Sequence, residues 1–213
     1  MGEHLEKLSV KYDIDIVYIV PYTEIREMSR MTEKLIIFAP YMDVLRPGRG
    51  MGLVLPEGIK AAGAKGVLLN HCEKPMSLSA VKQGIDRANE LDLLTLVCSD
   101  TLDEACAIAQ LGPDIINPEP TELIGSGNAS DLSFVLDTVK VIKKINPKIL
   151  VEQAAGITNG QQVYDFIMAG SEGAGAGSGI FTAKDPYAVS DEMIAAVRKA
   201  KNDLGNQLRT AEV

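Results

Sequence analysis

The chain has 213 residues, of which 46% are hydrophobic, and it carries a formal net charge of −8 at pH 7. This length is enough for one sizeable core, although it is short for an α/β barrel, which commonly has about 250 residues. The negative charge argues against nucleic-acid binding, which usually needs a basic face. No apolar run approaches the ~18 residues of a membrane span, so we expect no membrane association.

Cysteine and histidine usage bears on the cellular compartment and on metal binding. Cys72, Cys98 and Cys106 form no close pair, which favours free thiols in a reducing cytoplasm. Only His4 and His71 are present, and no Cys-x-x-Cys occurs, so we do not expect a structural zinc site. We expect neither a bound metal nor a cofactor.

Short apolar runs alternate with helical patterns from the first residues onward. We expect seven strands, each followed by a helix, with a half-helix before the first strand. The predicted strands are 14–20, 35–39, 66–70, 93–98, 115–116, 149–153 and 172–176. The predicted helices are 3–12, 22–33, 55–64, 79–90, 103–111, 132–145, 160–169 and 186–201. We expect a single domain over 1–213, in which the polar tail 202–213 frays.

Regular alternation of strands and helices predicts a parallel sheet, either open and doubly wound or closed into a barrel. No Gly-x-Gly-x-x-Gly follows the first strand, which weakens the dinucleotide-binding version of the open sheet. In a barrel, the chemistry lies just after the C-terminal ends of the strands. The distinctive residues lie there: Asn70–Glu73, Glu119, the Ala155–Gly156 turn and Gly177–Gly179.

The stretch 113–130 has the layout of a strand end, a restricted carboxylate and a hinge. Pro118 and Pro120 bracket Glu119 and limit its conformational freedom. Gly125 and Gly127 supply a flexible hinge, and the polar residues 128–130 are suited to cap the following helix. This layout fits a catalytic base beneath a mobile lid, and it fits an ordinary surface loop with an exposed glutamate equally well.

Four motifs, in order along the chain, resemble triosephosphate isomerases of the short type typical of archaea and some bacteria. They are Leu-Asn-His-Cys-Glu at 69–73, Glu-Pro-Thr-Glu-Leu-Ile-Gly-Ser-Gly at 119–127, Ala-Gly-Ile-Thr-Asn-Gly at 155–160, and Gly-Ser-Gly at 177–179 leading to Ala-Lys-Asp-Pro at 183–186. The resemblance implies a (β/α)₈ TIM barrel that interconverts glyceraldehyde 3-phosphate and dihydroxyacetone phosphate through an enediol. That enzyme is itself a well-known example of a glutamate base paired with a neutral histidine electrophile.

The resemblance also implies a role for each matching residue. Glu119 is expected to move the proton between two carbons, His71 to polarise the carbonyl, and Glu73 to support the site electrostatically. The residues expected to bind the substrate phosphate are Gly125, Ser126, Gly156, Ser178 and Gly179. Few basic residues occur in these loops, so the phosphate is expected to rest on backbone N–H groups. The expected partners are a sugar phosphate and copies of the same chain, in a homodimer or homotetramer.

Each of these residues also has a structural interpretation. His71 is alternatively a satisfied polar residue at a strand end, and Glu73 a surface cap or ion-pair partner. The Ser178–Gly179 pair is alternatively a turn before the last helix. We interpret Cys98 as a buried small apolar residue rather than a nucleophile. The loop residues Arg46–Arg49 fit a solvated loop, a substrate contact or a subunit contact, and we favour the last.

The sequence departs from the family at its first strand, which in the family ends in Asn-x-Lys and supplies the positive charge of the site. This chain begins within the expected first helix, and Lys7 and Lys11 do not match the lysine. Seven strands do not close an eight-stranded barrel without distortion, and the resulting edges invite pairing with another chain. The TIM barrel is therefore expected to be incomplete, with seven parallel strands. The chain is either truncated or a natural departure, and we favour truncation.

Two smaller departures leave the substrate open. Pro-Tyr-Met-Asp at 40–43 stands where the family commonly has Gln-His-x-Asp, and Gln-Ala-Ala-Gly at 153–156 replaces a more glycine-rich turn. An isomerase of a four-carbon sugar phosphate and a catalytically inactive phosphate-binding homologue therefore remain alternatives to the triose phosphate enzyme.

Overall fold

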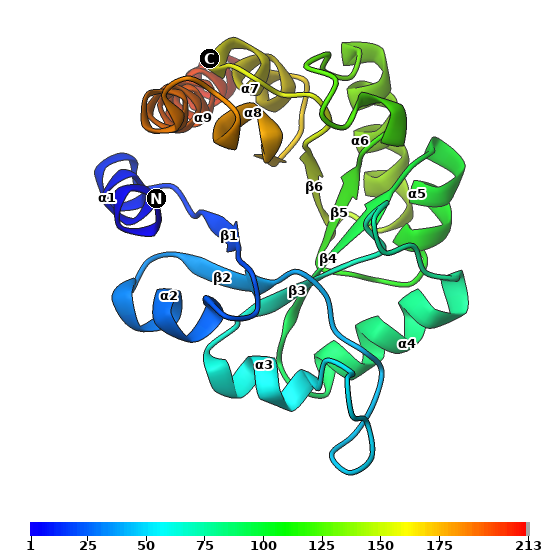
Figure 1. The fold of residues 1–213 in the computed structure, drawn as a ribbon. Helices are drawn as coiled ribbons and strands as arrows, with labels where there is room; N and C mark the ends of the chain where they lie inside the picture. Colours follow the sequence, from blue (N-terminus) through cyan, green and yellow to red (C-terminus); the bar gives the residue numbers. More distant parts are fainter. Residues whose placement is uncertain (212–213) are drawn as a thin grey trace.

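Seven parallel strands lie side by side in chain order and curl into an incomplete barrel that is open between β1 and β7 (Figure 1). The structure is a computed structural model that describes residues 1–211, with side chains through 207. The strands are β1 (Val17–Ile19), β2 (Ile36–Ala39), β3 (Gly66–Leu69), β4 (Leu94–Ser99), β5 (Ile115–Pro118), β6 (Leu150–Gln153) and β7 (Gly173–Ala174). The expected incomplete barrel of seven parallel strands is confirmed.

Helices follow the strands and form the outer layer (Figure 1). They are α1 (Gly2–Tyr12), α2 (Ile25–Met31), α3 (Pro56–Ala62), α4 (Leu78–Asn89), α5 (Leu102–Ala109), the 3₁₀ helix η1 (Thr121–Leu123), α6 (Leu132–Ile145), α7 (Gly160–Met168), α8 (Ser178–Phe181) and α9 (Pro186–Ala211). Sequence patterns predicted neither η1 nor α8, because each is a single turn without a complete apolar period.

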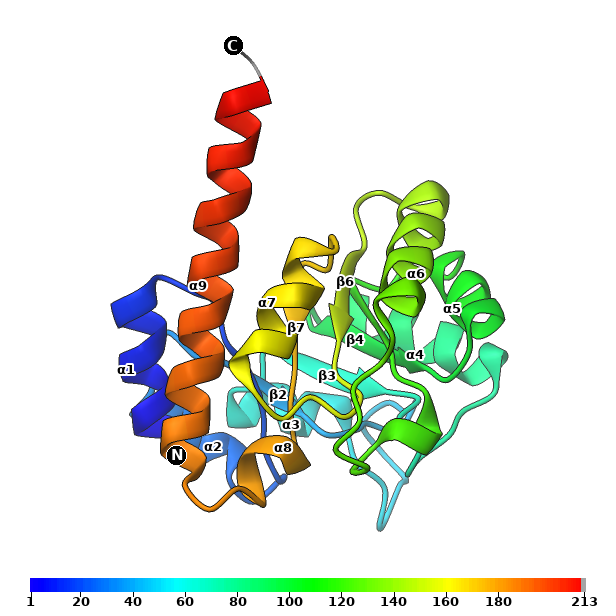
Figure 2. The same cartoon turned by 90° about the horizontal axis from the view of Figure 1, so that it is seen from above.

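The last helix is longer than expected, because residues 202–211, which were expected to fray, are helical. Helix α9 continues through Ala211 and extends past the rest of the molecule (Figure 2), whereas the apolar pattern indicated an end near Lys201. Half of residues 202–211 have low helix propensity (Asn202, Asp203, Gly205, Asn206 and Thr210), but extending a helix that is already packed is easier than starting one. Residues 212 and 213 lie outside the described residues.

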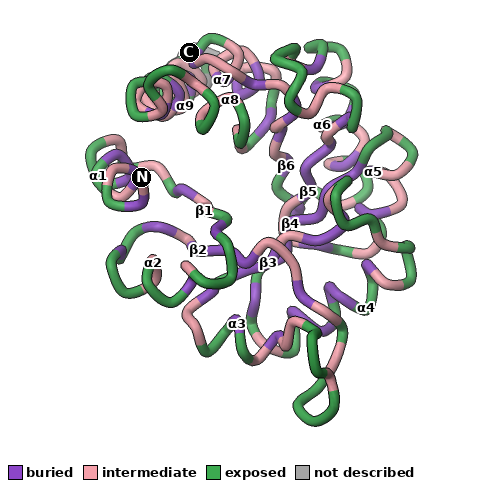
Figure 3. The backbone as a smooth tube through the Cα atoms, viewed as in Figure 1, coloured by how far each residue is buried: buried purple, intermediate pink, exposed green. Residues whose placement is uncertain are grey.

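Side chains alternate between two faces of the sheet, as in any strand. One face packs on the helices through a core that includes Ile37, Val67, Val97 and Ile116, and Figure 3 shows burial concentrated between strands and helices. The other face forms the barrel interior, where Phe38, Leu96 and Cys98 cluster, with the half-buried Val17, Ile36, Leu68 and Ile115 against them. The interpretation of Cys98 as a buried apolar residue is confirmed.

The two ends of the chain meet on the outside of the barrel. Helices α1 and α9 pack against each other, and the Arg198 guanidinium donates hydrogen bonds to the backbone carbonyls of Tyr12 and Asp13. Its Nη2 also lies 3.1 Å from the Asp13 carboxylate. The outer layer of helices is therefore continuous where the inner layer of strands is open.

The structure bears on two expectations about the surface of the molecule, the subunit contact at the loop 40–52 and membrane association. Arg46 lies in the exposed loop 40–52 and pairs with Glu90, with Nη2 and Oε1 2.7 Å apart, so a subunit contact there stays a prediction. Within residues 1–211, no helix has the length and apolar character needed to cross a membrane.

We predict that Gly66→Ala destabilises the fold by about 1–3 kcal/mol, because a methyl group there overpacks the barrel interior. A Cβ on Gly66 would lie 2.2 Å from the Phe38 ring. Urea unfolding measures the effect. The control is Gly58→Ala in α3, whose Cβ meets nothing closer than 3.8 Å and which gains helix propensity. Equal stability of Gly66→Ala and the wild type would contradict the packing described here.

Candidate active site

His71 follows β3 in a loop that is held in place by its neighbour, Asn70. The Asn70 backbone has a φ of 57°, which turns the chain at the strand end. Its side-chain amide donates to the Cys98 carbonyl at 2.9 Å and to Glu104 Oε1 at 3.0 Å, and its Oδ1 accepts from the Met76 N–H at 2.8 Å. Asn70 thereby ties the His71 loop to β4, a positioning role that the sequence analysis did not assign.

Glu119 lies immediately after β5 and is directed into the barrel mouth. Its backbone N–H donates to the Ser99 carbonyl at 2.7 Å, and its Oε2 accepts from Asn117 Nδ2 at 3.2 Å. The side chain is only 11% exposed, which does not fit an ordinary exposed loop glutamate. Burial raises the pKa of Glu119, while His71 and the Asn117 amide oppose the increase. A carboxylate with a raised pKa is a stronger base.

His71 and Glu119 face the same space, although β4 separates their strands. The distance from His71 Nε2 to Glu119 Oε2 is 3.9 Å, too long for a hydrogen bond. On the other side of the ring, the Glu73 backbone N–H lies 3.3 Å from His71 Nδ1. A backbone donor at Nδ1 favours the neutral tautomer that carries its proton on Nε2, so the ring can donate toward the shared space.

Glu73 is placed differently from the expectation that its carboxylate supports the site. Its side chain is 88% exposed, and its Oε2 lies 3.9 Å from His71 Nδ1. The contact that orders the histidine comes from the Glu73 backbone N–H instead. An electrostatic contribution from the carboxylate stays a prediction.

Backbone contacts connect the segments that carry the residues expected to bind phosphate. We call residues 121–128 the lid; Gly125 and Gly127 there have φ of 71° and 76°. Gly156 packs under the lid so closely that a Cβ would lie 1.9 Å from the Asn128 carbonyl oxygen. A Cβ on Gly179 would lie 1.9 Å from the carbonyl oxygen of Ile157. The lid, the turn after β6 and the start of α8 therefore stack on one another.

Ser126 and Ser178 occupy different parts of this stack. The Ser126 hydroxyl donates to the Leu123 carbonyl at 2.8 Å and accepts from the Asn128 N–H at 3.0 Å, so it holds the lid in a compact turn. Ser178 begins α8, a single turn in which the N–H groups of Ile180 and Phe181 donate to the Gly177 carbonyl at 3.1 and 3.0 Å, so the N–H groups of Ser178 and Gly179 are the ones left for an anion. These N–H groups suit an anion better than the Ser126 hydroxyl does.

The expected cap of helix α6 by residues 128–130 is wrong. The N-cap residue is Asp131, without a side-chain hydrogen bond to the helix. The Ser130 hydroxyl is buried and has no hydrogen-bond partner among the described residues. The polar residues ahead of α6 form the end of the lid and pack on the Gly156 turn, and this packing overrides the local capping preference.

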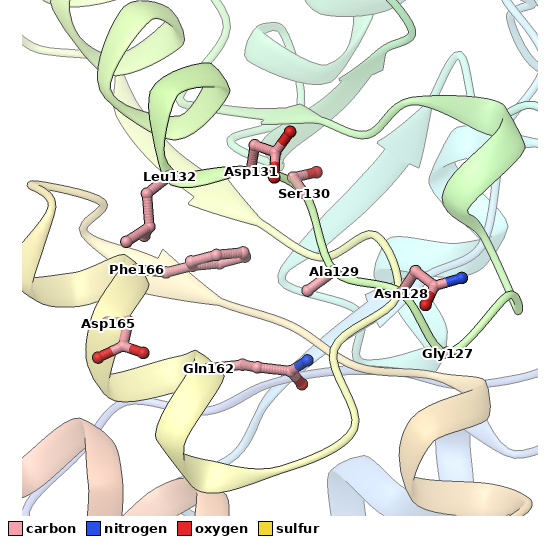
Figure 4. Close-up of a pocket in the computed structure, with 9 residues that line it drawn as sticks. All are labelled: Gly127, Asn128, Ala129, Ser130, Asp131, Leu132, Gln162, Asp165 and Phe166. Atoms are coloured by element: carbon pink, nitrogen blue, oxygen red, sulfur yellow. The ribbon is translucent and has the colours of Figure 1, made fainter.

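A cavity of about 370 Å³ lies between the end of the lid and α7 (Figure 4). Its lining residues are Gly127, Asn128, Ala129, Ser130, Asp131, Leu132, Gln162, Asp165 and Phe166. His71 and Glu119 do not line it, so it lies behind the lid rather than at the proposed reacting centre.

Glu152 is a half-buried residue with a buried carboxylate oxygen, and the sequence analysis missed it. Ile115, whose side chain packs in the barrel interior, pairs with Leu150 of β6. Glu152 lies two residues after Leu150, so its side chain is on the same inner face, next to Asn117 of β5. Its Oε2 is buried without a hydrogen-bond partner in residues 1–211. Burial, reinforced by the charge of Glu119, raises the pKa of Glu152 to about 7. An acidic residue at an inward position of a short apolar strand was the available signal.

No group of three or more His, Cys, Asp or Glu side chains within the described part of the chain is arranged to hold a metal ion. Burial and the carboxylates of Glu119 and Glu152 place the pKa of the Cys98 thiol well above its ordinary value. A buried thiol of this kind is unreactive.

Comparisons with known proteins agree with the sequence resemblance. The family model described as triosephosphate isomerase matches residues 1–195. The triosephosphate isomerase of Sulfurisphaera tokodaii is 36% identical over 94% of this chain and 88% of its own. That of Methanothermus fervidus is 33% identical over 91% of this chain and 88% of its own. The crystal structure of the Bartonella henselae triosephosphate isomerase has a TM-score of 0.74 at 15% identity, covering 94% of this chain and 92% of that one, which supports the fold.

We predict that Glu152→Gln changes how stability depends on pH. The folded-state pKa of Glu152 is about 7, above its ordinary value of 4.5, so the folded protein keeps this proton up to a higher pH than the unfolded chain does. Stability is therefore lost as the pH rises from 4.5 to about 7, by at most about 3 kcal/mol. Glutamine removes that loss and should make the variant more stable than the wild type at pH 8.

Urea unfolding of both proteins at several pH values measures the difference. The control is Glu33→Gln, which changes an exposed glutamate and should follow the wild type at each pH. Parallel curves for Glu152→Gln and the wild type would show that Glu152 titrates normally.

Proposed function

The chain belongs to the triosephosphate isomerase family, and from that premise we propose that it interconverts glyceraldehyde 3-phosphate and dihydroxyacetone phosphate through an enediol. One observation carries the proposal. Glu119 Oε2 and His71 Nε2 approach to 3.9 Å at the mouth of the barrel, where one acts as a base and the other as a hydrogen-bond donor.

Glu119 takes the proton from the carbon next to the carbonyl group. The electron pair of that C–H bond forms the carbon–carbon double bond, and the carbonyl π electrons move onto oxygen. The Nε2–H of neutral His71 stabilises this oxygen and passes protons between the two oxygens. Glu119, now a carboxylic acid, returns its proton to the neighbouring carbon. The raised pKa of Glu119 suits both halves of this cycle, since it must accept and release one proton.

The stacked backbone of the lid, the Gly156 turn and the start of α8 is the proposed phosphate site. Close approach at Gly156 and Gly179 leaves no room for side chains there, which favours contact through N–H groups. Gly125, Ser126 and Ser178 complete the proposed set. Such a site holds a dianion in a protein of net charge −8 because the donors are local.

Gln153, the first residue of the altered turn at 153–156, gives little support to the idea that the turn accommodates a different substrate. Gln153 is buried, and its Nε2 donates to Thr138 Oγ1 of α6 at 2.9 Å, so its side chain points toward the helices rather than toward the substrate. An isomerase of a four-carbon sugar phosphate and an inactive phosphate-binding homologue are the competing proposals.

We further propose a single domain over 1–213, a cytoplasmic location, and a homodimer or homotetramer that uses the loop 40–52.

We predict that Glu119→Gln lowers kcat/KM for the triose phosphates by about 10²–10⁴-fold, because the amide cannot act as the base. The control is Glu33→Gln, an exposed glutamate between α2 and β2, which should retain the wild-type rate. A coupled assay in both directions measures the rates. An unchanged rate in Glu119→Gln would overturn the assignment of the base.

Binding and turnover separate the competing proposals. Titration calorimetry with dihydroxyacetone phosphate reports binding by a protein that lacks catalysis, and an assay with erythrose 4-phosphate reports the four-carbon reaction. Binding without turnover would favour the inactive homologue. Faster turnover of the four-carbon substrate would replace the triose phosphate assignment.

A further inference from the structure

Glu104, in the first turn of α5, contacts two loops that leave neighbouring strands. Its Oε1 accepts a hydrogen bond from the Asn70 side-chain amide at 3.0 Å, and its Oε2 accepts one from the Asp100 backbone N–H at 2.7 Å. Asn70 directly precedes His71 after β3, and Asp100 lies in the turn between β4 and α5. One carboxylate therefore connects the His71 loop with the turn after β4.

The connection continues from Asp100 to the first residue of the lid. Asp100 Oδ1 accepts from the backbone N–H of Thr121 at 2.6 Å. Thr121 lies two residues after Glu119, at the start of η1. The neighbouring Ser99 carbonyl accepts from the Glu119 N–H at 2.7 Å. The turn after β4 thus holds the backbone of the proposed base and the backbone of the lid hinge.

At the other end of the connection, Asn70 is fixed by all of its side-chain groups. Its Nδ2 also donates to the Cys98 carbonyl at 2.9 Å, and its Oδ1 accepts from the Met76 N–H at 2.8 Å. Asn70 is buried, and Glu104 is half-buried. Hydrogen bonds to a carboxylate are stronger than those between neutral groups. A displacement of Glu104 therefore changes the hydrogen bonding of both loops.

Helix capping alone does not account for the contacts of Glu104. Thr101 is the N-cap of α5, and its Oγ1 accepts from the Glu104 N–H at 3.2 Å. In a capping box, the glutamate three residues after the N-cap returns to the backbone N–H of the N-cap residue itself. Glu104 instead directs one oxygen to Asp100, ahead of the cap, and the other to Asn70, 34 residues earlier in the sequence.

We infer that Glu104 is a positioning residue that links the His71 loop to the hinge of the lid. It acts through Asn70 on one side and through Asp100 on the other. The link sets the imidazole relative to the hinge, and hence relative to Glu119, which precedes the hinge by two residues. The effect of the link on catalysis rests on the proposed isomerase function, whereas the link itself is tested without turnover.

The first test is amide hydrogen exchange measured by NMR on Glu104→Gln. Glutamine has nearly the same shape, but only one of its two end groups can accept a hydrogen bond. Exchange should become faster at Thr121 and at Met76 by about fivefold or more, the factor that one hydrogen bond typically contributes. Glu104 contacts neither amide, so the change reaches them through Asp100 and Asn70.

Two control variants separate the link from local effects on α5. Thr101→Ala removes the cap of the helix and leaves both Glu104 oxygens with their partners. Asp103→Asn removes a neighbouring carboxylate from the same turn. Both should keep the wild-type exchange rates at Thr121 and Met76 and the wild-type kcat. Circular dichroism confirms that each variant is folded.

The second test is steady-state kinetics with the triose phosphates. Glu104→Gln should lower kcat by about tenfold to a hundredfold and leave KM nearly unchanged, because it misplaces reacting groups without touching the substrate. Asn70→Gly keeps the positive φ and removes the amide through which Glu104 acts. The double variant should therefore be barely slower than Asn70→Gly, whereas independent effects would multiply.

Four results would overturn the inference. They are unchanged exchange at both amides in Glu104→Gln, the same faster exchange in Thr101→Ala, multiplying effects in the double variant, and faster exchange with an unchanged kcat. A wild-type chain without turnover would instead contradict the proposed function. The exchange rates would still decide whether Glu104 links the two loops.

Discussion

The hydrogen bond from the Glu119 N–H to the Ser99 carbonyl extends the pairing of β4 and β5 past the last strand residue, and the site depends on it. It fixes the backbone of the proposed base to the sheet, so only rotation of the Glu119 side chain remains to be restrained. The Asn117 amide supplies that restraint from two residues away. Asn70 does the same for the histidine loop, tying it to the Cys98 carbonyl one residue before Ser99. Two loops that are 48 residues apart in numbering are thus both attached to the end of β4.

The raised pKa values in the barrel interior arise because several hydrogen-bond acceptors, among them the carboxylates of Glu119 and Glu152, are buried there with few hydrogen-bond donors. Glu119 is balanced in part by Asn117 and His71, and its pKa is raised only because burial outweighs them. Glu152 lacks such partners, and its pKa reaches about 7. At neutral pH the interior therefore holds a carboxylate that is close to half-protonated, next to the proposed base.

The sequence was sufficient to predict the parallel sheet, the incomplete barrel and the order of all elements except the single turns η1 and α8, because apolar runs and longer helical periods alternate along the chain. It was also sufficient to place His71 and Glu119 at strand ends, where parallel strands bring them to one edge. Asn70 and Glu152 were missed because their roles depend on register and on burial by distant segments. The cap at 128–130 and the end of α9 were predicted wrongly, since tertiary packing overrode local preference at both places.

The contact between α1 and α9 joins residues nearly 190 positions apart, and it bears on how the molecule forms. During synthesis, α1 leaves the ribosome before α9, yet the surface that covers Leu5 and Leu8 includes this later helix. Until then its apolar face has no final partner, and a strand edge beside it is also bare. Such surfaces favour association of unfinished chains, so this molecule should rely on chaperones or on slow synthesis more than its small size suggests.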